Sequence, residues 1–373
     1  PSKLPDWLAE FLGWADESMR LEVWANADTP EDARKARELG ATGIGLCRTE
    51  HMFMQQDRLP VVQRMIISDT PEARAEALAQ LLPFQQDDFA GILEAMAGYP
   101  VTIRLLDPPL HEFLPSLEEL LVATTELRLT KGESDPEYVE KMRVLARVRA
   151  LHEQNPMLGL RVCRLGILYP EIYAMQVRAI FEAACDLRAR GVDARPDVMI
   201  PGVGTIEEMR ITHDAVKLAA DEVILRRGVA VPYRIGTMVE LPRACVVADD
   251  LARIAQFFSF GTNDLTQTTY GYSRDDAEAS FIPRYLELKI LKDDPFQVLD
   301  RTGVGGLMRM GVERGRASRP ELKIGICGEH GGEPSSVAFC DELGLDYVSC
   351  SPYRVPIARL AAAQSATATA TDV

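Results

Sequence analysis

Short apolar runs recur along this chain and alternate with amphipathic segments, a pattern that predicts buried strands separated by helices. The runs predict eight strands, at residues 21–27, 43–47, 101–105, 160–163, 197–201, 233–239, 257–261 and 323–327. Helix signals lie between them, for example Thr29 as a cap before Pro30 at the first helical position. Strands that alternate with helices indicate a parallel sheet. Eight such strands close an α/β barrel of the (β/α)₈ or TIM type.

The segments outside the strands predict additions to this barrel. Two connections, 106–158 and 265–322, are too long for structureless loops, so we expect helical insertions in both. Residues 6–19 have the period of an amphipathic helix with its aromatic residues on one side. The expected parts are an N-terminal helix packed on the barrel (1–20), the barrel (21–364) and a flexible tail of small polar residues (365–373).

Six of the predicted strands end in residues that could bind an anion or act on it. These residues are Arg48, Arg104, Arg161, Glu240, the run Thr262-Asn263-Asp264, and Cys327. A charge at the end of a buried strand is costly unless it is paired or used. All strands of a parallel barrel point the same way, so their carboxyl ends lie on one face. We therefore expect these scattered residues to form a single pocket.

The arginines among them predict a site for a small, highly charged anion. A guanidinium presents a planar fork that matches carboxylate or phosphate oxygens. The alternative is that each arginine forms a structural ion pair, for instance Arg48 with Glu50 or Arg104 with Asp107. Several arginines on one rim favour the anion site over separate ion pairs.

The carboxylates predict a metal site at two neighbouring strand ends. Glu240 and Asp264 would leave room for water and substrate oxygens, which suits Mg²⁺. Histidine and cysteine clusters with zinc spacing are absent from the sequence. Asp264 could instead cap a helix, which leaves Glu240 unexplained. The backbone N–H groups of Gly261, Thr262 and Asn263 could hold a phosphate at that helix start.

Cys327 lies between glycines in a charged loop, which favours a chemical role over simple packing. Its thiol could be a nucleophile, an acid–base group or inert, and His330 could tune it. None of the seven cysteines forms a C-x-x-C pair, and the others lie in apolar or helical settings. Disulfides are not expected, which fits a reducing cytoplasm.

Charge and hydropathy exclude two classes of partner. The chain has 41 basic and 56 acidic residues and a net charge of −15, which argues against binding nucleic acid. No apolar stretch reaches the length that spans a bilayer, and the first residues lack the apolar core of a signal peptide. We expect neither a nucleic acid nor a membrane as partner.

Several runs in the chain closely resemble the C-terminal phosphoenolpyruvate/pyruvate-binding domain of the pyruvate, phosphate dikinase family. They are GIGLCRTEHMF, TIRLLDPPLHEFLP, NPMLGLRVCRLG, GTMVELPRA, SFGTNDLTQTTYGYSRDD, GICGEHGGEPSSVAFC and YVSCSPYRVPIARLAAAQ. The likeness extends from about residue 21 to 364. Its RTE, GTND and CGE elements also occur in phosphoenolpyruvate synthase and in the first enzyme of the sugar phosphotransferase system. The resemblance implies a (β/α)₈ barrel that binds phosphoenolpyruvate or pyruvate with Mg²⁺.

The same resemblance implies a role for each matching residue. Arg48 and Arg104 would hold the phosphoryl group with Arg161 nearby, Glu240 and Asp264 would ligate Mg²⁺, Gly261, Thr262 and Asn263 would contact substrate, Arg274 would contact phosphate, and Cys327 would protonate the methylene carbon of the pyruvate enolate. Val162 departs from the family, which usually has glycine after the arginine at 161. A side chain there puts the role of Arg161 in doubt and makes Arg164 its rival.

The activity that the resemblance implies needs a partner. Family members transfer phosphate from a swivelling domain whose phosphohistidine has a Thr-Ser-His setting, and none of the five histidines here has it. We expect a cytoplasmic phosphotransferase that carries out a partial reaction, as an excised or separately encoded domain. Family members commonly form homodimers through this domain. The alternatives are a non-catalytic barrel that binds phosphoenolpyruvate as a sensor or scaffold, and a related enolate lyase.

Overall fold

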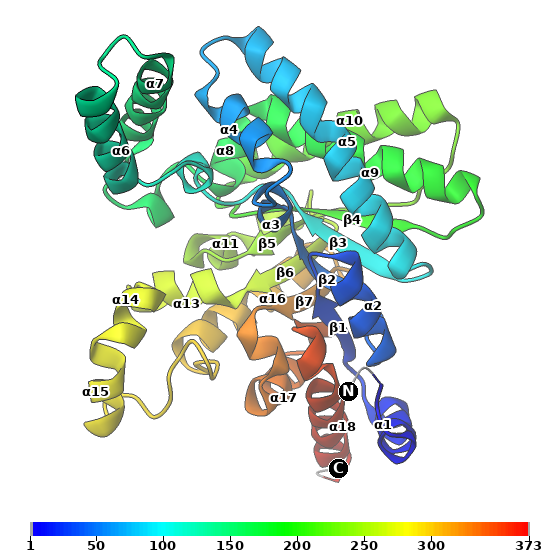
Figure 1. Cartoon of the computed structure of the whole chain (residues 1–373). Helices are drawn as coiled ribbons and strands as arrows, with labels where there is room; N and C mark the ends of the chain where they lie inside the picture. The colour runs from blue at the N-terminus through cyan, green and yellow to red at the C-terminus, as the bar shows by residue number, and fades with distance from the viewer. Residues whose placement is uncertain (1–2, 372–373) are drawn as a thin grey trace.

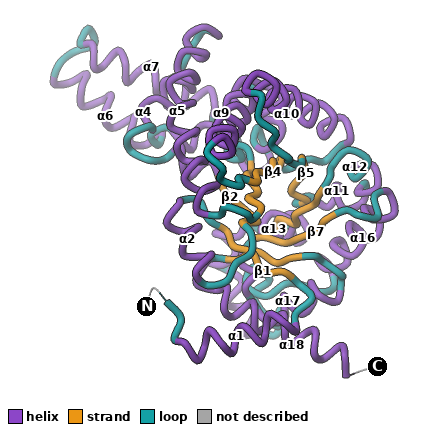
Figure 2. The backbone as a smooth tube through the Cα atoms, turned by 90° about the vertical axis from the view of Figure 1, so that its right-hand side faces the viewer, coloured by secondary structure: helices purple, strands orange, loops and turns teal. Residues whose placement is uncertain are grey.

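Eight parallel strands form a closed barrel in the computed structural model, which describes residues 3–371 (Figure 1, Figure 2). In chain order the strands are β1 (Glu22–Asn26), β2 (Ile44–Arg48), β3 (Pro100–Arg104), β4 (Arg195–Ile200), β5 (Ile235–Val239), β6 (Phe257–Gly261), β7 (Lys323–Cys327) and β8 (Tyr347–Cys350). Each strand pairs with its neighbours in sequence, and β8 closes the circle on β1. The predicted fold class, an α/β TIM barrel, is confirmed.

Helices surround the barrel and fill the connections between its strands (Figure 2). They are α1 (Asp6–Ser18), α2 (Pro30–Glu38), α3 (Thr49–Phe53), α4 (Leu59–Ile67), α5 (Pro71–Ala95), α6 (Leu117–Thr130), α7 (Pro136–Leu151), α8 (Val162–Leu168), α9 (Pro170–Ala189), α10 (Ile206–Arg227), α11 (Pro242–Val246), α12 (Ala248–Leu251), α13 (Thr262–Tyr270), α14 (Arg274–Ala279), α15 (Phe281–Glu287), α16 (Gly303–Ser318), α17 (Pro334–Glu342) and α18 (Val355–Thr371). Short 3₁₀ turns are η1 (Leu110–Phe113), η2 (Pro156–Leu158), η3 (Glu329–Gly332) and η4 (Pro352–Arg354).

One predicted strand is wrong. Residues 160–163 lie where helix α8 begins at Val162, whose first residues Val162 and Cys163 are buried, and the fourth strand is β4 instead. The strand that restores the number to eight is β8, which the sequence analysis missed. Its four residues form a run too short to stand out from the helices around it.

The strand register brings the predicted site residues together. Arg48 at the end of β2 pairs with Arg104 at the end of β3, and Gly261 of β6 pairs with Cys327 of β7. Inside the barrel the rings of Trp24 and Tyr347 stack with centroids 3.9 Å apart. A Cβ at residue 325 would lie 2.1 Å from the Tyr347 ring, so glycine is required beside it.

The two ends of the described chain form a helix pair. Helix α1 buries Leu12 and Ala15, and its Asp16 forms an ion pair with Arg359 of α18 at 2.6 Å. The aromatic side of α1 faces outward, where Trp7 is 70% and Trp14 is 60% exposed. Residues 365–371, predicted as part of a flexible tail, continue α18 as a helix. The flexibility of that segment stays a prediction, and residues 1–2 and 372–373 lie outside the described part.

Both long connections carry helices, as expected from their length. Helices α6 and α7 lie in the connection from β3 to β4, and α14 and α15 lie in the connection from β6 to β7 (Figure 1). The second insertion has an apolar cluster of its own, built on Ala277, Ile282 and Phe296.

Candidate active site

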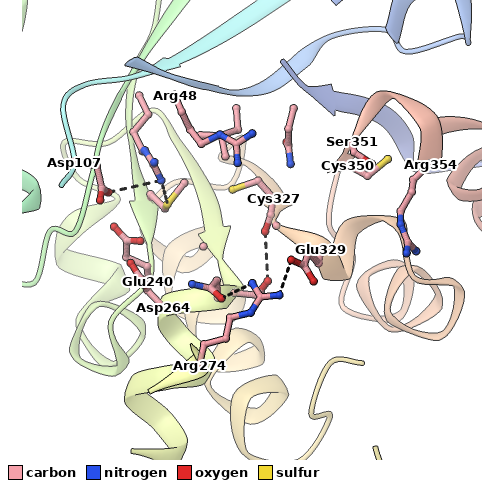
Figure 3. A pocket seen from close by; sticks show the side chains of 18 of the residues that line it. Arg48, Asp107, Glu240, Asp264, Arg274, Cys327, Glu329, Cys350, Ser351 and Arg354 are labelled. Carbon is pink, nitrogen blue, oxygen red and sulfur yellow. Dashed lines mark hydrogen bonds and ion pairs between the residues drawn. The ribbon is translucent and has the colours of Figure 1, made fainter. Parts of the chain in front are cut away.

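The carboxyl ends of the strands surround a cavity of about 520 Å³ (Figure 3). Its lining includes all ten residues that the sequence predicts for the site: Arg48, Arg104, Arg161, Glu240, Gly261, Thr262, Asn263, Asp264, Arg274 and Cys327. A cavity of this size suits a small molecule. The structure thus brings these residues together, while their chemical roles stay predictions.

Arg48 is held by Asp28, which the sequence analysis did not select. The Asp28 carboxylate accepts the Arg48 backbone N–H at 2.7 Å and pairs with its guanidinium at 3.0 Å. Burial acts to raise the pKa of Asp28, but His51 and Arg48 outweigh it, so this pKa lies below its ordinary value. Asp28 is therefore ionised and orients Arg48. The alternative pairing of Arg48 with Glu50 is wrong, because Glu50 pairs with Arg104.

Asp107 joins two further arginines. The Arg161 guanidinium donates to Asp107 at 2.6 Å and to Asp264 at 3.1 Å. The Arg104 guanidinium lies 3.6 Å from the other Asp107 oxygen, and it also bonds to Glu50. Burial opposes the charge on Asp107, but Arg104 and Arg161 lower its pKa. Arg104 therefore combines both interpretations that the sequence offered, since it is ion-paired and also lines the cavity.

Arg161 lines the main cavity and Arg164 does not, while the choice between them as the substrate contact stays a prediction. Val162 has φ +53°, a left-handed conformation that a β-branched residue rarely adopts. Its N–H donates to the Asp107 carbonyl at 2.8 Å, which holds the turn in place. Arg161 thereby lines the main cavity, whereas Arg164 donates to the Gly159 carbonyl at 2.8 Å. Valine here keeps the conformation that glycine would adopt freely, at a cost in strain of about 1–3 kcal/mol.

Glu240 and Asp264 form the acidic side of the cavity (Figure 3). Glu240 is only 2% exposed, and one of its oxygens has no hydrogen-bond partner among the described residues. Burial raises the pKa of Glu240 well above its ordinary value, and the neighbouring Asp264 and Asp107 raise it further. The alternative role of Asp264 as helix cap is wrong, because the N-cap of α13 is Gly261 and Asp264 lies within the first turn.

These two carboxylates fit a hard divalent cation. Two close carboxylates repel each other and need a proton or a cation between them. The unpartnered Glu240 oxygen is the kind of group that a metal would satisfy. No group of three or more His, Cys, Asp or Glu side chains with metal-binding geometry occurs among residues 3–371. Mg²⁺ does not require one, since it keeps water and substrate oxygens beside one or two carboxylates.

Helix α13 begins at the cavity and carries the polar run of the site. Its first-turn N–H groups lack partners within the helix and belong to residues that line the cavity. The Asn263 side chain accepts a hydrogen bond from Arg274 at 3.0 Å. Arg274 also bonds to Glu278 at 2.9 Å. Its bond to Glu329 at 2.5 Å is drawn in Figure 3. The second insertion thus places an arginine at the mouth of the cavity.

Cys327 lies at the cavity wall and is almost fully buried. Burial raises the pKa of its thiol, while a hydrogen bond from Ser259 at 3.4 Å and the charge of Arg104 act in the opposite direction. The thiol therefore carries its proton near neutral pH. His330 does not tune it directly, since its ring nitrogens bond to Thr262 and Pro295. All seven cysteines are free, as expected.

Several residues that shape the site were not predicted from the sequence, namely Asp28, Ser259, Glu329, and Glu50 and Asp107 in the pairings they form here. A signal existed for Asp28, which follows β1 and so lies at the same face as the other strand ends. Ser259 gives no signal, because a serine inside a strand is common and only its contact with Cys327 marks it. Site residues at strand ends can therefore be predicted from the sequence, whereas site residues at inward-facing positions within strands cannot.

The fold and this site correspond to a known class. Residues 5–367 match the family model described as "PEP-utilising enzyme, PEP-binding domain". The chain belongs to the family of phosphoenolpyruvate-utilising enzymes.

Within that class the similar curated proteins are pyruvate, phosphate dikinases. The chain is 57% identical over 364 residues to pyruvate, phosphate dikinase 1, chloroplastic, of Arabidopsis thaliana, covering 98% of this chain and 37% of that protein. It is 56% identical over 367 residues to pyruvate, phosphate dikinase 2 of Zea mays, covering 98% and 40%. The chain thus spans about two fifths of the length of these relatives.

A comparison with solved structures adds little to this assignment. A crystal structure of a citrate lyase from Burkholderia xenovorans LB400 aligns with a TM-score of 0.38 and 14% identity, covering 79% of this chain and 74% of that one. A likeness of that size carries no argument about function. Within residues 3–371, every helix is too short or too polar to cross a bilayer.

Proposed function

We propose that this domain catalyses phosphoryl transfer between phosphoenolpyruvate and a phosphohistidine on another domain, by way of the pyruvate enolate. The observation that carries the proposal is one cavity lined by five arginines, the Glu240–Asp264 pair and a protonated thiol. Arginines suit a phosphate, paired carboxylates suit a metal, and an acid–base group suits enolisation. Strand ends of the same barrel supply Arg48, Arg104, Glu240, Asp264 and Cys327, while Arg161 immediately precedes helix α8 and Arg274 begins α14.

The arginines supply binding and charge neutralisation. In phosphoryl transfer the protein positions the groups and stabilises charge on the transferred oxygens. Arg48 and Arg104 come from neighbouring strand ends, and both guanidinium groups are oriented by carboxylates. Orientation before substrate arrives lowers the cost of ordering these long side chains. Arg274 of α14 and Arg354 of η4 also line the cavity.

Cys327 supplies the proton that completes the reaction toward pyruvate. When the phosphorus–oxygen bond breaks and a phosphorus–nitrogen bond forms on histidine, the electron pair stays on the substrate as an enolate. The Cys327 thiol then gives its proton to the methylene carbon, and the thiolate regains a proton from solvent. Burial favours the protonated thiol, as a proton donor requires.

Mg²⁺ held by Glu240 and Asp264 would neutralise the oxyanion charge of the enolate. The Arg161 guanidinium donates a hydrogen bond to Asp264 at 3.1 Å, which orients that carboxylate. Asp107 in turn holds Arg161 at 2.6 Å. Glu240 itself has a raised pKa because it is buried beside Asp264 and Asp107, so binding of the cation would release its proton.

The test is solvent exchange of the pyruvate methyl protons, followed by NMR in deuterium oxide with Mg²⁺. We expect exchange with the wild-type domain and a loss of about 100-fold or more in Cys327→Ala, the size typical of a general acid–base group. Cys340→Ala is the matched control, because Cys340 is a buried free cysteine of helix α17. That control is expected to exchange at the wild-type rate.

The outcomes separate this function from its alternatives. Binding of phosphoenolpyruvate without proton exchange in the wild type would identify a sensor or scaffold. Exchange that survives in Cys327→Ala would remove the thiol from the mechanism. An enolate lyase would consume pyruvate only when an aldehyde or acyl acceptor is added.

The proposal includes a phosphohistidine-bearing domain as partner. The greater length of the relatives supports it, since they extend well beyond the matched part. We also propose a homodimer, which sedimentation of the purified chain tests. Cytoplasmic location stays a proposal; the names of several plant relatives include the word chloroplastic.

A further inference from the structure

His330 is the residue of the CGEHGGEP run that the proposed function leaves unused. It lies in η3 just after β7 and is 1% exposed. Its Nδ1 is 2.7 Å from the Thr262 hydroxyl, and its Nε2 is 2.8 Å from the Pro295 carbonyl oxygen. One imidazole therefore joins the start of α13, which lines the cavity, to the far end of the second insertion.

The partners of the ring define its hydrogen bonding. A carbonyl oxygen can only accept, so Nε2 carries the proton and donates to Pro295. Burial lowers the pKa of His330, so the ring is neutral and Nδ1 accepts from the Thr262 hydroxyl. That hydroxyl has one hydrogen, and the Cys327 carbonyl is a more distant acceptor at 3.3 Å. His330 therefore fixes the direction of the Thr262 hydroxyl, in a residue that lines the cavity.

The Pro295 contact acts on the insertion that carries Arg274. Phe296, the next residue, is a member of the small apolar cluster, and the Arg274 guanidinium lies 5.8 Å from its ring centroid. Arg274 begins α14 at the other end of the same insertion. Its backbone N–H donates to Gln267 of α13 at 2.8 Å. The insertion is thus tied to the barrel on the side of Arg274 and again at Pro295.

We propose that His330 is a positioning residue. It holds the Thr262 hydroxyl and the insertion that carries Arg274 in fixed positions relative to each other at the cavity mouth. Its imidazole works through Thr262 and Pro295 and does not itself touch the reacting atoms. The inference rests on the proposed function for its kinetic consequences. The tether itself is a property of the fold and can be measured without substrate.

Two amide variants remove the two hydrogen bonds of the imidazole one at a time. In His330→Asn the side-chain oxygen can reach the Nδ1 position and accept from Thr262, but nothing reaches Pro295. In His330→Gln the longer amide can place its NH₂ at the Nε2 position and donate to Pro295, while the contact to Thr262 is lost. Each variant removes one hydrogen bond and keeps a polar group in the pocket.

Three measurements then apply to the whole domain with Mg²⁺. Hydrogen–deuterium exchange of residues 291–298 is expected to accelerate in His330→Asn and to stay at the wild-type rate in His330→Gln. The dissociation constant of phosphoenolpyruvate is expected to rise about three- to ten-fold in His330→Asn, the loss of roughly one hydrogen bond in positioning Arg274. The rate constant of pyruvate methyl-proton exchange is expected to fall mainly in His330→Gln, which frees Thr262.

The difference between the two variants in these three measurements decides the proposal. If both variants loosen the insertion equally, or neither does, His330 is only a buried packing residue and the proposal is overturned. If the insertion responds as expected but affinity and rate are unchanged, the tether does not position the site and the proposal is again overturned. A wild-type domain that neither binds phosphoenolpyruvate nor exchanges protons refutes the proposed function, while deuterium exchange still reports on the tether.

Discussion

Asp107 shows how a buried charge can be kept ionised by its neighbours. Burial alone favours the neutral acid, but Arg104 and Arg161 reverse that preference and lower its pKa. The same carboxylate then fixes the position of Arg161 at 2.6 Å. A single acidic residue thus sets the geometry of one arginine and contributes to that of another.

Replacing Asp107 by asparagine leaves two buried arginines with less compensating charge. We expect Asp107→Asn to lower the free energy of unfolding at pH 7 by about 3 kcal/mol, the cost of removing one partner of a buried ion pair. Asp193→Asn is the control, since the Asp193 side chain is 43% exposed where it pairs with Arg195 and Arg188. That loss should stay below about 1 kcal/mol. Urea denaturation followed by circular dichroism gives both values.

The effect of Asp107 also has a defined pH dependence. Its folded-state pKa lies below its unfolded value of 3.8, so the folded state binds fewer protons than the unfolded state in that range. Its contribution to stability is full above pH 3.8 and is lost as the pH falls through the folded-state pKa. The difference between wild type and Asp107→Asn should therefore shrink as the pH falls below about 4. A difference that grows on acidification would contradict the assigned charge state.

At the scale of elements, the connection after β4 supports the turn that places Arg161. Gly202 has φ +62°, and a Cβ there would lie 2.4 Å from the Val162 side chain. Val162 itself has a left-handed backbone. The two residues pack against each other, so a change on one side displaces the other.

Gly202→Ala is expected to be costly for this reason. A left-handed backbone costs an alanine about 1–2 kcal/mol, and the clash with Val162 adds to this cost. We therefore expect Gly202→Ala to lower the free energy of unfolding by at least about 2 kcal/mol. Gly191→Ala is the matched control, with φ +82° and no described atom within 4 Å of the added Cβ. Gly191→Ala should lower the free energy of unfolding only by the cost of the left-handed backbone. Equal decreases in the two variants would show that the Val162 side chain moves aside without an energetic cost.

The elements also show where sequence reasoning succeeded and where it failed. Strands ending in Arg48, Arg104, Gly261 and Cys327 were predictable, because an apolar run followed by a charged or glycine-rich segment is a local signal. The true start of α8 at Val162 was not, since its left-handed backbone is imposed by tertiary contacts with Asp107 and Gly202. The pairing of Asp28 with Arg48 likewise depends on which strands are neighbours.

At the scale of the molecule, the barrel collects residues that lie far apart in sequence. Arg48 and Cys327 line one cavity because β2 and β7 end on the same face. The cavity opens beside the insertion of α14 and α15, which contributes Arg274. The fold accordingly separates tasks: the closed sheet fixes the reacting groups, and the insertion adds an arginine at the entrance.

The most direct measurement of the central claim is calorimetric titration of phosphoenolpyruvate into the domain with and without Mg²⁺. We predict that the wild-type domain binds phosphoenolpyruvate in a way that depends on Mg²⁺. We also predict that Glu240→Gln loses this dependence, because the amide removes one of two carboxylates facing the cavity. Equal binding with and without Mg²⁺, or full Mg²⁺ dependence in Glu240→Gln, would contradict the central claim.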